Sequence, residues 1–316
     1  MKSVGIVDSS LSKRPRASRI ELRMNLEGTA SFVKKTPSYI RTASLGESVV
    51  AYWLRYFGNR RFPSEQEFYV VYTSMDHSIP FQPHSALNYW TCYLEFVPTA
   101  MRLGSVTSKE FFGEIKSAFV DIAREGCAAF KAVPTIMPRL SDHKGHALHA
   151  AQALLKPVNC SPSLHTAAPF YAYNLAATYF PEKEADVRQH VGDVVSTVIR
   201  TKLHAMVDIA FGIFLARKAI EDKLGLDFVD LESFFTQVQK RKDGIPYEHV
   251  YRMYHEINDL DRASGGGACR LPEVMERYFR EIGLPRVRRE RSNCLYDLEQ
   301  KELVYSSELK VGNGLL

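Results

Sequence analysis

The sequence predicts an all-α fold, a helical bundle without membrane-spanning segments, and three observations support this. Apolar residues recur at helical spacing through most of the 316 residues, whereas the alternating runs typical of strands are scarce. Hydrophobic residues make up 45% of the chain, which is enough to bury a substantial core. The most apolar segments, 167–180 and 205–216, are shorter than the roughly 20 apolar residues that cross a bilayer or are flanked by charge.

The chain divides into three parts by composition. Residues 1–40 carry Ser, Lys and Arg without clear periodicity and are expected to form a flexible N-terminal arm. Residues 41–285 are expected to form one helical domain, which would contain the functional site. Residues 286–316 begin with a basic run and fit a tail that forms a short hairpin or an arm.

Helical periodicity and turn residues locate the helices of this domain. The expected helices, in chain order, are 44–57, 87–103, 108–133, 146–155, 165–179, 185–224, 231–240, 246–260 and 272–282. The helix at 185–224 is long enough to be divided near Ser196. A loop rich in Pro and His at 134–146 and a break at 156–162 separate the middle helices, and a Gly-rich turn at 264–267 precedes the last one.

Charge and cysteine content narrow the function classes. The net charge of +5 is modest and the basic residues are spread along the chain, so no nucleic-acid partner is expected, whereas a small anionic substrate fits. The five cysteines form no C-x-x-C pair, which argues against a zinc ribbon and a disulfide framework. The N-terminus lacks the apolar core of a secretory signal. A cytoplasmic location is therefore expected, with peripheral membrane contact and the oligomeric state left open.

The first candidate site segment is N-C-S-P-S-L-H, residues 159–165. Pro162 and Ser163 fit the start of a helix, and His165 follows in its first turn. The free N–H groups and the positive dipole end of such a start favour phosphate, to which Ser163 would add a hydroxyl donor. The same residues are also common at an ordinary helix N-cap.

The second candidate segment is R-T-K-L-H-A-M-V-D, residues 200–208. His204 and Asp208 are four residues apart and would share one face of an apolar helix. A carboxylate in that place would hold the imidazole in one tautomer and raise its basicity, as in a catalytic triad. Arg200 and Lys202 would supply positive charge for a phosphate. The ordinary alternative is a satisfied core histidine beside a helix-surface carboxylate.

A metal site and a cofactor are not expected. The run H-x-x-H-x-x-H at His143, His146 and His149 is the best candidate for metal ligation. It lacks a matching carboxylate or cysteine at an assured distance, and a zinc site needs such a partner.

Together the two segments resemble the second and third motifs of the type 2 phosphatidic acid phosphatase superfamily, most closely those of its inositol phosphorylceramide synthase branch. Two further stretches are similar to motifs of this family. D-H-S-I-P-F-Q-P, residues 76–83, is similar to the opening segment of that branch, and K-A-V-P-T-I-M-P-R, residues 131–139, to the first motif. The resemblance spans residues 76–219 and implies a helical bundle of the phosphatidic acid phosphatase type 2 and haloperoxidase kind.

The resemblance implies a role for each matching residue. His204 would be the nucleophile that forms a phosphohistidine, Asp208 would orient it, and His165 would be the general acid and then the general base. The phosphate would be bound by Lys131, Arg139, Ser163 and Lys202, with Arg200 as a further cation. Val198 stands where the family usually has an arginine, six residues before the nucleophile.

The function that follows is hydrolysis of a lipid-like phosphate or diphosphate, with a prenyl or other long chain. Aromatic side chains would line the apolar tail, although on periodicity alone ordinary core packing is the better explanation of their spacing. They are Tyr89, Tyr93, Phe170 and Tyr173. Three alternatives remain: a prenyl diphosphate cyclase or transferase that uses the same pocket, a vanadate-dependent haloperoxidase, which the missing arginine argues against, and a non-catalytic helical scaffold.

Overall fold

The computed structural model describes most of the helical domain. It covers residues 67–82, 109–137, 160–240, 243–265, 271–289, 295–297 and 302–305, and parts of 47–54 and 99–108. Over these residues the chain is mostly helical, as predicted. None of the helices described there combines the length and the hydropathy of a membrane span. The helix expected at 146–155, most of that at 87–103, and Tyr89, Tyr93 and Arg139 lie outside the described residues.

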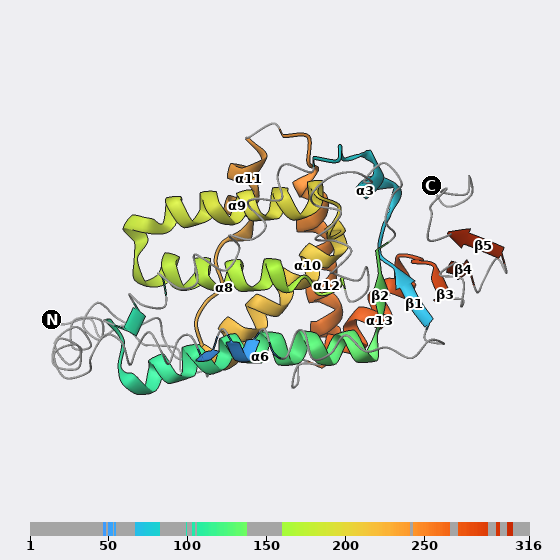
Figure 1. Ribbon diagram of the computed structural model, residues 1–316. Coiled ribbons are helices and arrows are strands. Elements are labelled where there is room, and N and C mark those ends of the chain that lie inside the picture. The colour runs from blue at the N-terminus through green and yellow to red at the C-terminus, as the bar shows by residue number, and fades with distance from the viewer. Residues whose placement is uncertain are drawn as a thin grey trace, which may run out of the picture.

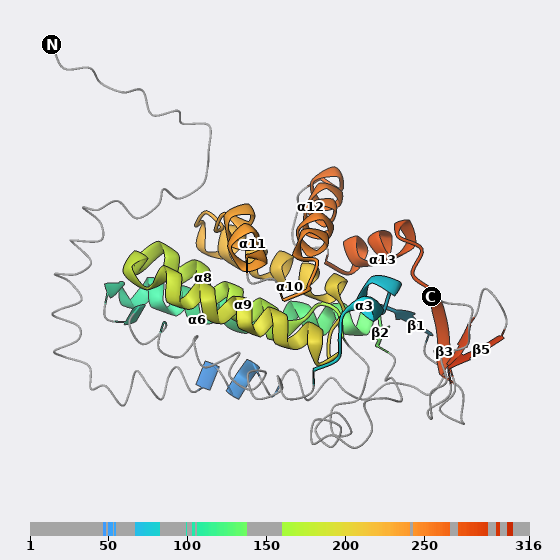
Figure 2. The same ribbon diagram turned by 90° about the horizontal axis from the view of Figure 1, so that it is seen from above.

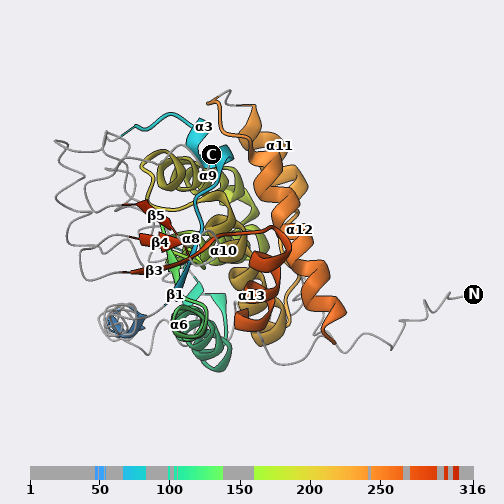
Figure 3. The same ribbon diagram turned by 90° about the vertical axis from the view of Figure 1, so that its right-hand side faces the viewer.

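Over the described residues, four helices form the body of the bundle and three more flank it, in the arrangement that Figure 1 shows. The body consists of α6 (Lys109–Ala132), α8 (Leu164–Tyr179), α9 (Glu184–Arg200) and α10 (Met206–Lys218). The flanking helices are α11 (Leu231–Gln239), α12 (Tyr247–Ala263) and α13 (Leu271–Glu281), which lie together on one side of the body (Figures 2 and 3). A short helix, α3 (Ser74–Ser78), lies near the end of α9 (Figure 1). The predicted helices at 108–133, 165–179, 231–240, 246–260 and 272–282 are confirmed to within a few residues.

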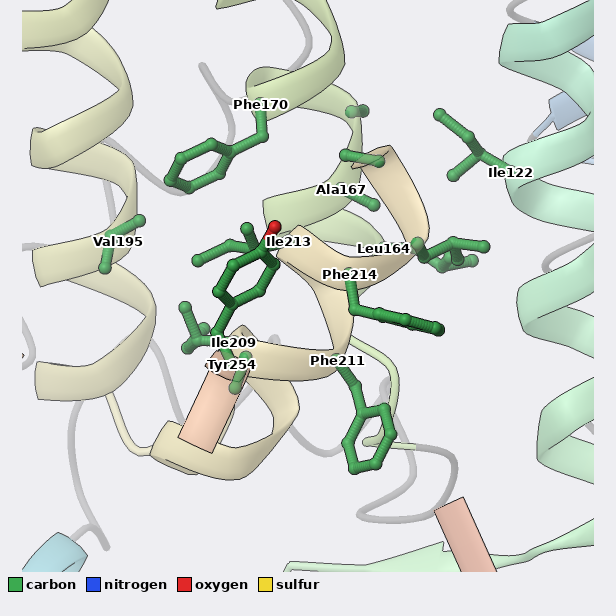
Figure 4. Close-up of a cluster of buried hydrophobic side chains, with 14 of the residues drawn as sticks. Ile122, Leu164, Ala167, Phe170, Val195, Ile209, Phe211, Ile213, Phe214 and Tyr254 are labelled. Atoms are coloured by element: carbon green, nitrogen blue, oxygen red, sulfur yellow. The ribbon is translucent and has the colours of Figure 1, made fainter. Parts of the chain in front are cut away.

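Helix α10 is the centre of the core. All its residues from Met206 to Ala216 are buried, and it packs against both α8 and α12. Its Phe211, Ile213 and Phe214 lie among side chains of the neighbouring helices (Figure 4). A helix that is hydrophobic all round needs a buried place, and α10 has one in the protein core. This burial fixes the start of α10, where the candidate residues lie.

The single helix predicted at 185–224 is wrong: the chain turns at residues 201–205, between α9 and α10, and not near Ser196. The Thr201 hydroxyl donates to the Thr197 carbonyl at 2.7 Å, and Lys202 takes a left-handed conformation with φ 53°. The N–H groups of the next two residues then donate to the Val198 carbonyl at 3.3 Å. This closes the end of α9 in the manner of a helix C-cap, without the glycine that usually marks one.

A small five-stranded sheet lies at one end of the bundle (Figure 1) and departs from the all-α prediction. Its strand order is β2 (Thr135–Ile136), β1 (Glu67–Val70), β3 (Arg286–Arg289), β4 (Leu295–Asp297) and β5 (Glu302–Tyr305). The first two strands pair in parallel and the others antiparallel. The tail is expected to form a short hairpin or an arm, and its consecutive strands β3, β4 and β5 do pair antiparallel as in hairpins, while β3 also joins them to β1 in one sheet. Strands of two to four residues are too short to show a periodicity of two.

Gly212 lets α10 approach the first turn of α8 closely. A Cβ atom there would lie 2.5 Å from the Ser163 carbonyl oxygen and 3.0 Å from the Thr166 Cβ. Because the nearer atom belongs to the backbone, Gly212→Ala is expected to lower the free energy of unfolding by about 1–3 kcal/mol or more, as overpacking does. Denaturant titration measures this change.

The matched control is Gly113→Ala, at an open position of α6 where an added Cβ meets nothing within 4 Å. It should raise the free energy of unfolding by about 0.5–1 kcal/mol, because alanine loses less backbone entropy in a helix. Equal effects of the two substitutions would contradict the close helix contact at Gly212.

Candidate active site

Two histidines, one from a helix and one from a turn between helices, meet at the end of the bundle near β2. His165 lies in the first turn of α8, and His204 lies in the turn that precedes α10. The His165 Nδ1 is 3.3 Å from the His204 Nε2, and the ring centroids are 5.4 Å apart. Both side chains are buried. The expected meeting of these two residues, 39 positions apart in the chain, is therefore present in the structure.

The surroundings of His204 determine its tautomer. Its Nδ1 is 2.9 Å from the Cys160 carbonyl oxygen and 3.4 Å from the Asp208 Oδ2. A carbonyl oxygen only accepts hydrogen bonds, so the Nδ1 of His204 carries a proton and donates it. In the neutral ring, Nε2 then holds the free electron pair, and this is the atom that faces His165.

This arrangement also assigns the protons of His165. Since the Nε2 of neutral His204 accepts, the Nδ1 of His165 must be the donor across the 3.3 Å contact. The pair thus places a nucleophilic nitrogen and a proton donor side by side. Chemically it can exchange a proton with a group that binds beside the two rings.

Asp208 holds the first turn of α10 and the imidazole together. Its Oδ2 accepts from the Ala205 N–H at 2.9 Å as well as facing His204. Burial raises the pKa of the Asp208 carboxyl, while His204, the Ala205 N–H and the Ser161 hydroxyl act to lower it. The prediction that the two residues share one helix is wrong, because His204 lies in the turn before α10, yet their side chains meet.

The Cys160 carbonyl is held by the sheet. The Thr135 hydroxyl on β2 accepts from the backbone N–H groups of Cys160 and Ser161, each at 3.0 Å. These bonds fix the chain just before α8, and so aim the carbonyl oxygen of Cys160 at His204. The small sheet therefore supports the site through Thr135 of β2.

The cations predicted to bind phosphate lie in different surroundings. The Lys202 ammonium is buried, donates to the Asp76 carbonyl and lies 5.7 Å from the centroid of the Tyr72 ring. The Arg200 guanidinium donates to the Gln82 side chain and the Asp243 carbonyl. Lys131 is exposed in the last turn of α6, and among the described residues it forms no hydrogen bond or ion pair with either histidine. Of the three, Lys202 is the one next to His204 in a buried turn.

Ser163 is fully buried and joins the two candidate segments. Its N–H donates to the Asp208 carbonyl at 2.9 Å, and its hydroxyl accepts from the Thr166 hydroxyl at 3.0 Å. These contacts tie the start of α8 to the first turn of α10, a structural role besides the predicted phosphate contact.

The two described aromatic residues of the predicted tail site make core contacts. Phe170 packs against Phe234 with ring centroids 4.9 Å apart, and Tyr173 packs against the same ring at 5.5 Å. The Tyr173 hydroxyl donates to Glu184 at 2.6 Å. Their neighbours are therefore protein side chains, while Tyr89 and Tyr93 lie outside the described residues.

Three residues of the site were given no role from the sequence, although each lies in a segment that resembles a family motif. They are Asp76, Thr135 and Cys160, of which the last contributes only a backbone carbonyl. Asp76 had a local signal, because Thr73 lies three residues before it in the pattern of a capping box. No sequence pattern marks a threonine whose hydroxyl accepts from a segment 25 residues away.

The part of the chain that the structure describes contains no group of three or more His, Cys, Asp or Glu residues arranged to hold a metal ion. Comparison of the chain with models of known protein families, with characterised proteins and with solved structures gives no match. The chemistry of the site must therefore be argued from its own geometry.

Proposed function

We propose that this protein transfers the phosphoryl group of a lipid-like phosphate or diphosphate to His204 and then to water. The observation that carries the proposal is the buried imidazole pair, in which the Nε2 of His204 faces the Nδ1 of His165 at 3.3 Å. A nucleophile within hydrogen-bonding reach of an acid–base group, and oriented by a third group, is the arrangement of covalent catalysis.

In the first step, the electron pair on the Nε2 of His204 attacks phosphorus. The bond from phosphorus to the leaving oxygen breaks, and His165, which begins the step as an imidazolium protonated on both ring nitrogens, gives that oxygen a proton and becomes neutral. In the second step, His165 removes a proton from water as the water attacks phosphorus, and the P–N bond breaks to release inorganic phosphate and restore both rings. The acid and base roles of one histidine in the two steps are those of general acid–base catalysis near neutral pH.

The groups behind His204 suit this chemistry. As Nε2 bonds to phosphorus the imidazole becomes positively charged, and the charge is stabilised at Nδ1–H by the Cys160 carbonyl and the Asp208 carboxylate. Both acceptors are fixed before the reaction, one by β2 and the other by α10. Preorganised acceptors of this kind need no reorganisation as the charge develops.

The lipid-like character of the substrate rests on the motif resemblance and not on a pocket. Phe170 and Tyr173 pack against Phe234, so the tail is not placed against them. Within the proposal, the tail lies against other parts of the chain or remains partly in a membrane surface.

A substrate panel tests the proposal. Purified protein is incubated with farnesyl diphosphate, geranylgeranyl diphosphate, long-chain phosphatidic acid and glucose 6-phosphate, with and without a chelator, and released phosphate or diphosphate is measured. We expect turnover of the long-chain compounds that survives chelation and is inhibited by vanadate. Rapid acid-free quenching and peptide mass spectrometry should find a phosphoryl group on His204. Each apolar CH₂ of the substrate that is buried adds about 0.8 kcal/mol to binding, so kcat/KM should rise steeply with chain length.

The same panel separates the alternatives. A cyclic hydrocarbon or alcohol product with release of diphosphate would assign the site to a prenyl diphosphate cyclase. Oxidation of halide by peroxide, only with vanadate added, would assign it to a haloperoxidase. Turnover of glucose 6-phosphate as fast as of the long-chain compounds would contradict the lipid-like substrate, and a folded protein inert toward all of them would contradict the phosphoryl-transfer proposal.

A further inference from the structure

One residue, Asp76 of α3, holds the chain on both sides of His204. Its Oδ1 accepts from the Met206 N–H at 2.8 Å, two residues after His204. Its backbone carbonyl accepts from the ammonium of Lys202, two residues before His204. The turn that carries the imidazole is thus tied at each side to the same residue, from a helix 130 positions earlier in the chain.

Asp76 is itself rigidly held. Its side chain is buried, and its Oδ2 accepts from the N–H of Thr73 at 3.0 Å and from the Thr73 hydroxyl at 2.7 Å. Both carboxylate oxygens therefore have hydrogen-bond donors, and one of these donors belongs to the first turn of α10. Burial raises the pKa of the Asp76 carboxyl, its hydrogen bonds to Thr73 and Met206 lower it, and the nearby Asp208 raises it further.

The start of α10 needs such a partner. The residue before the helix is Ala205, whose side chain has no oxygen to accept from the first N–H groups. Asp208 accepts from Ala205 and Asp76 accepts from Met206, so two carboxylates from different elements cap one helix end. Negative charge is favoured at the N-terminus of a helix.

We propose that Asp76 is a positioning residue that holds the His204 imidazole in its reactive orientation through the first turn of α10 and through Lys202. Its effect on turnover rests on the proposed function, whereas its effect on the His204 ring does not. Because misplacement of a nucleophile by about 1 Å can cost about a hundredfold in rate, removal of the carboxylate should lower kcat by about 10–100-fold and leave KM nearly unchanged.

The test compares three variants with the wild-type protein. Asp76→Ala removes the acceptor. Asp76→Asn keeps the size of the side chain, but its amide must turn N–H groups toward either Met206 or Thr73. It should therefore show the same changes in kcat and in the His204 signal at smaller amplitude. It replaces the alanine variant in the test if that variant does not fold. The control is Asn174→Ala, which also removes a buried polar side chain with two backbone partners. These partners are the N–H of Val229 at 2.7 Å and the carbonyl of Asp227 at 3.3 Å, and they lie in a different loop.

Two readouts are measured for each variant: kcat and KM on the best long-chain substrate, and the nitrogen NMR signals of His204 in protein labelled at histidine. The His204 signals are assigned by their loss in His204→Asn. We expect the wild type and Asn174→Ala to show one His204 tautomer protonated at Nδ1, and both Asp76 variants to show a mixed or broadened signal.

Each outcome decides the proposal. The proposal is supported if the His204 signal changes in the Asp76 variants and stays unchanged in Asn174→Ala. This holds even if the wild-type protein turns over none of the substrates, because in that case only the proposed function fails. Folded Asp76 variants that keep the wild-type His204 signal overturn it. So does a control variant that disturbs the ring as much as they do, because the effect would then be a general loss of stability.

Discussion

Replacement of His204 by asparagine is expected to lower kcat/KM for phosphate release by at least about a thousandfold, because removing the nucleophile of a covalent mechanism removes the reaction path itself. Asparagine is chosen because its amide N–H can still donate to the Cys160 carbonyl, as the Nδ1–H of His204 does at 2.9 Å. The folded structure should therefore persist, and circular dichroism and thermal unfolding check that it does. No phosphoryl group should be trapped on this variant.

A matched histidine substitution controls for loss of an imidazole as such. His255→Asn lies on α12, where the ring is exposed and packs beside Tyr251 with centroids 4.3 Å apart. This variant should keep wild-type turnover. If His204→Asn retained more than about a tenth of the wild-type kcat/KM, a phosphohistidine at this position would be ruled out, since the loss expected for a nucleophile is far larger.

Replacement of His165 by asparagine is expected to separate the two chemical steps. The asparagine amide can still donate to the Nε2 of His204 but cannot exchange a proton with water, so hydrolysis of the phosphohistidine should slow by about 10²–10⁴-fold. With p-nitrophenyl phosphate, whose leaving group departs without a proton, we expect one rapid burst of nitrophenol per protein molecule followed by very slow turnover. Mass spectrometry should then find the phosphoryl group on His204.

The burst is what distinguishes this prediction from a general loss of activity. A variant of His165 that merely distorts the site would slow both steps together and show no burst. The double variant with His204→Asn should also show none. A burst that persists in the double variant would place the covalent intermediate on another residue and contradict the assignment of His204.

The helical part of the fold follows from the sequence because its helices are amphipathic or wholly apolar over several turns. Residues 108–133 show a helical stripe long enough to be recognised, and Ser108 provides the N-cap by accepting from the Phe111 N–H at 3.2 Å. The break at 201–205 was not predictable in this way. Thr201, Lys202 and Leu203 continue the pattern of a helix, and the turn is made by a lysine in a left-handed conformation, which few lysines adopt.

The candidate site could be predicted in part because its chemistry lies in side chains whose types and spacing resemble those of known motifs. His165, His204 and Asp208 were singled out from their segments, and the structure brings the three together. Asp76 and Cys160 lie in segments that were singled out, but their supporting roles were not predicted, since Asp76 acts on a backbone N–H 130 residues away and Cys160 acts through its own backbone. Contacts of that kind depend on the tertiary fold, and the capping-box pattern of Thr73 and Asp76 indicates only the start of α3.

The surroundings of the aromatic residues depend on side-chain packing that periodicity does not reveal. A helix such as α8, apolar on all sides, has the same pattern whether its rings line a ligand or fill a core. In the structure, Phe170 and Tyr173 meet Phe234 of α11, a helix more than fifty residues later. Only this long-range contact identifies their neighbours.

The pairing of β1 with β3 has a consequence for the order in which the protein folds during synthesis. Glu67 lies opposite Arg288 and Tyr69 opposite Arg286, so a strand made early waits for a partner made near the end. Contacts between such distant segments form slowly, because a long loop must close first. During synthesis the N-terminal part of the chain also leaves the ribosome before the C-terminal part. Until residue 289 has left the ribosome, β1 has only the two-residue β2 beside it, and its other edge is open to pairing with foreign chains. The bundle that carries both histidines is already synthesised by then. Strand β1, which pairs with the strand of Thr135, is therefore the last element near the site to gain both of its neighbouring strands.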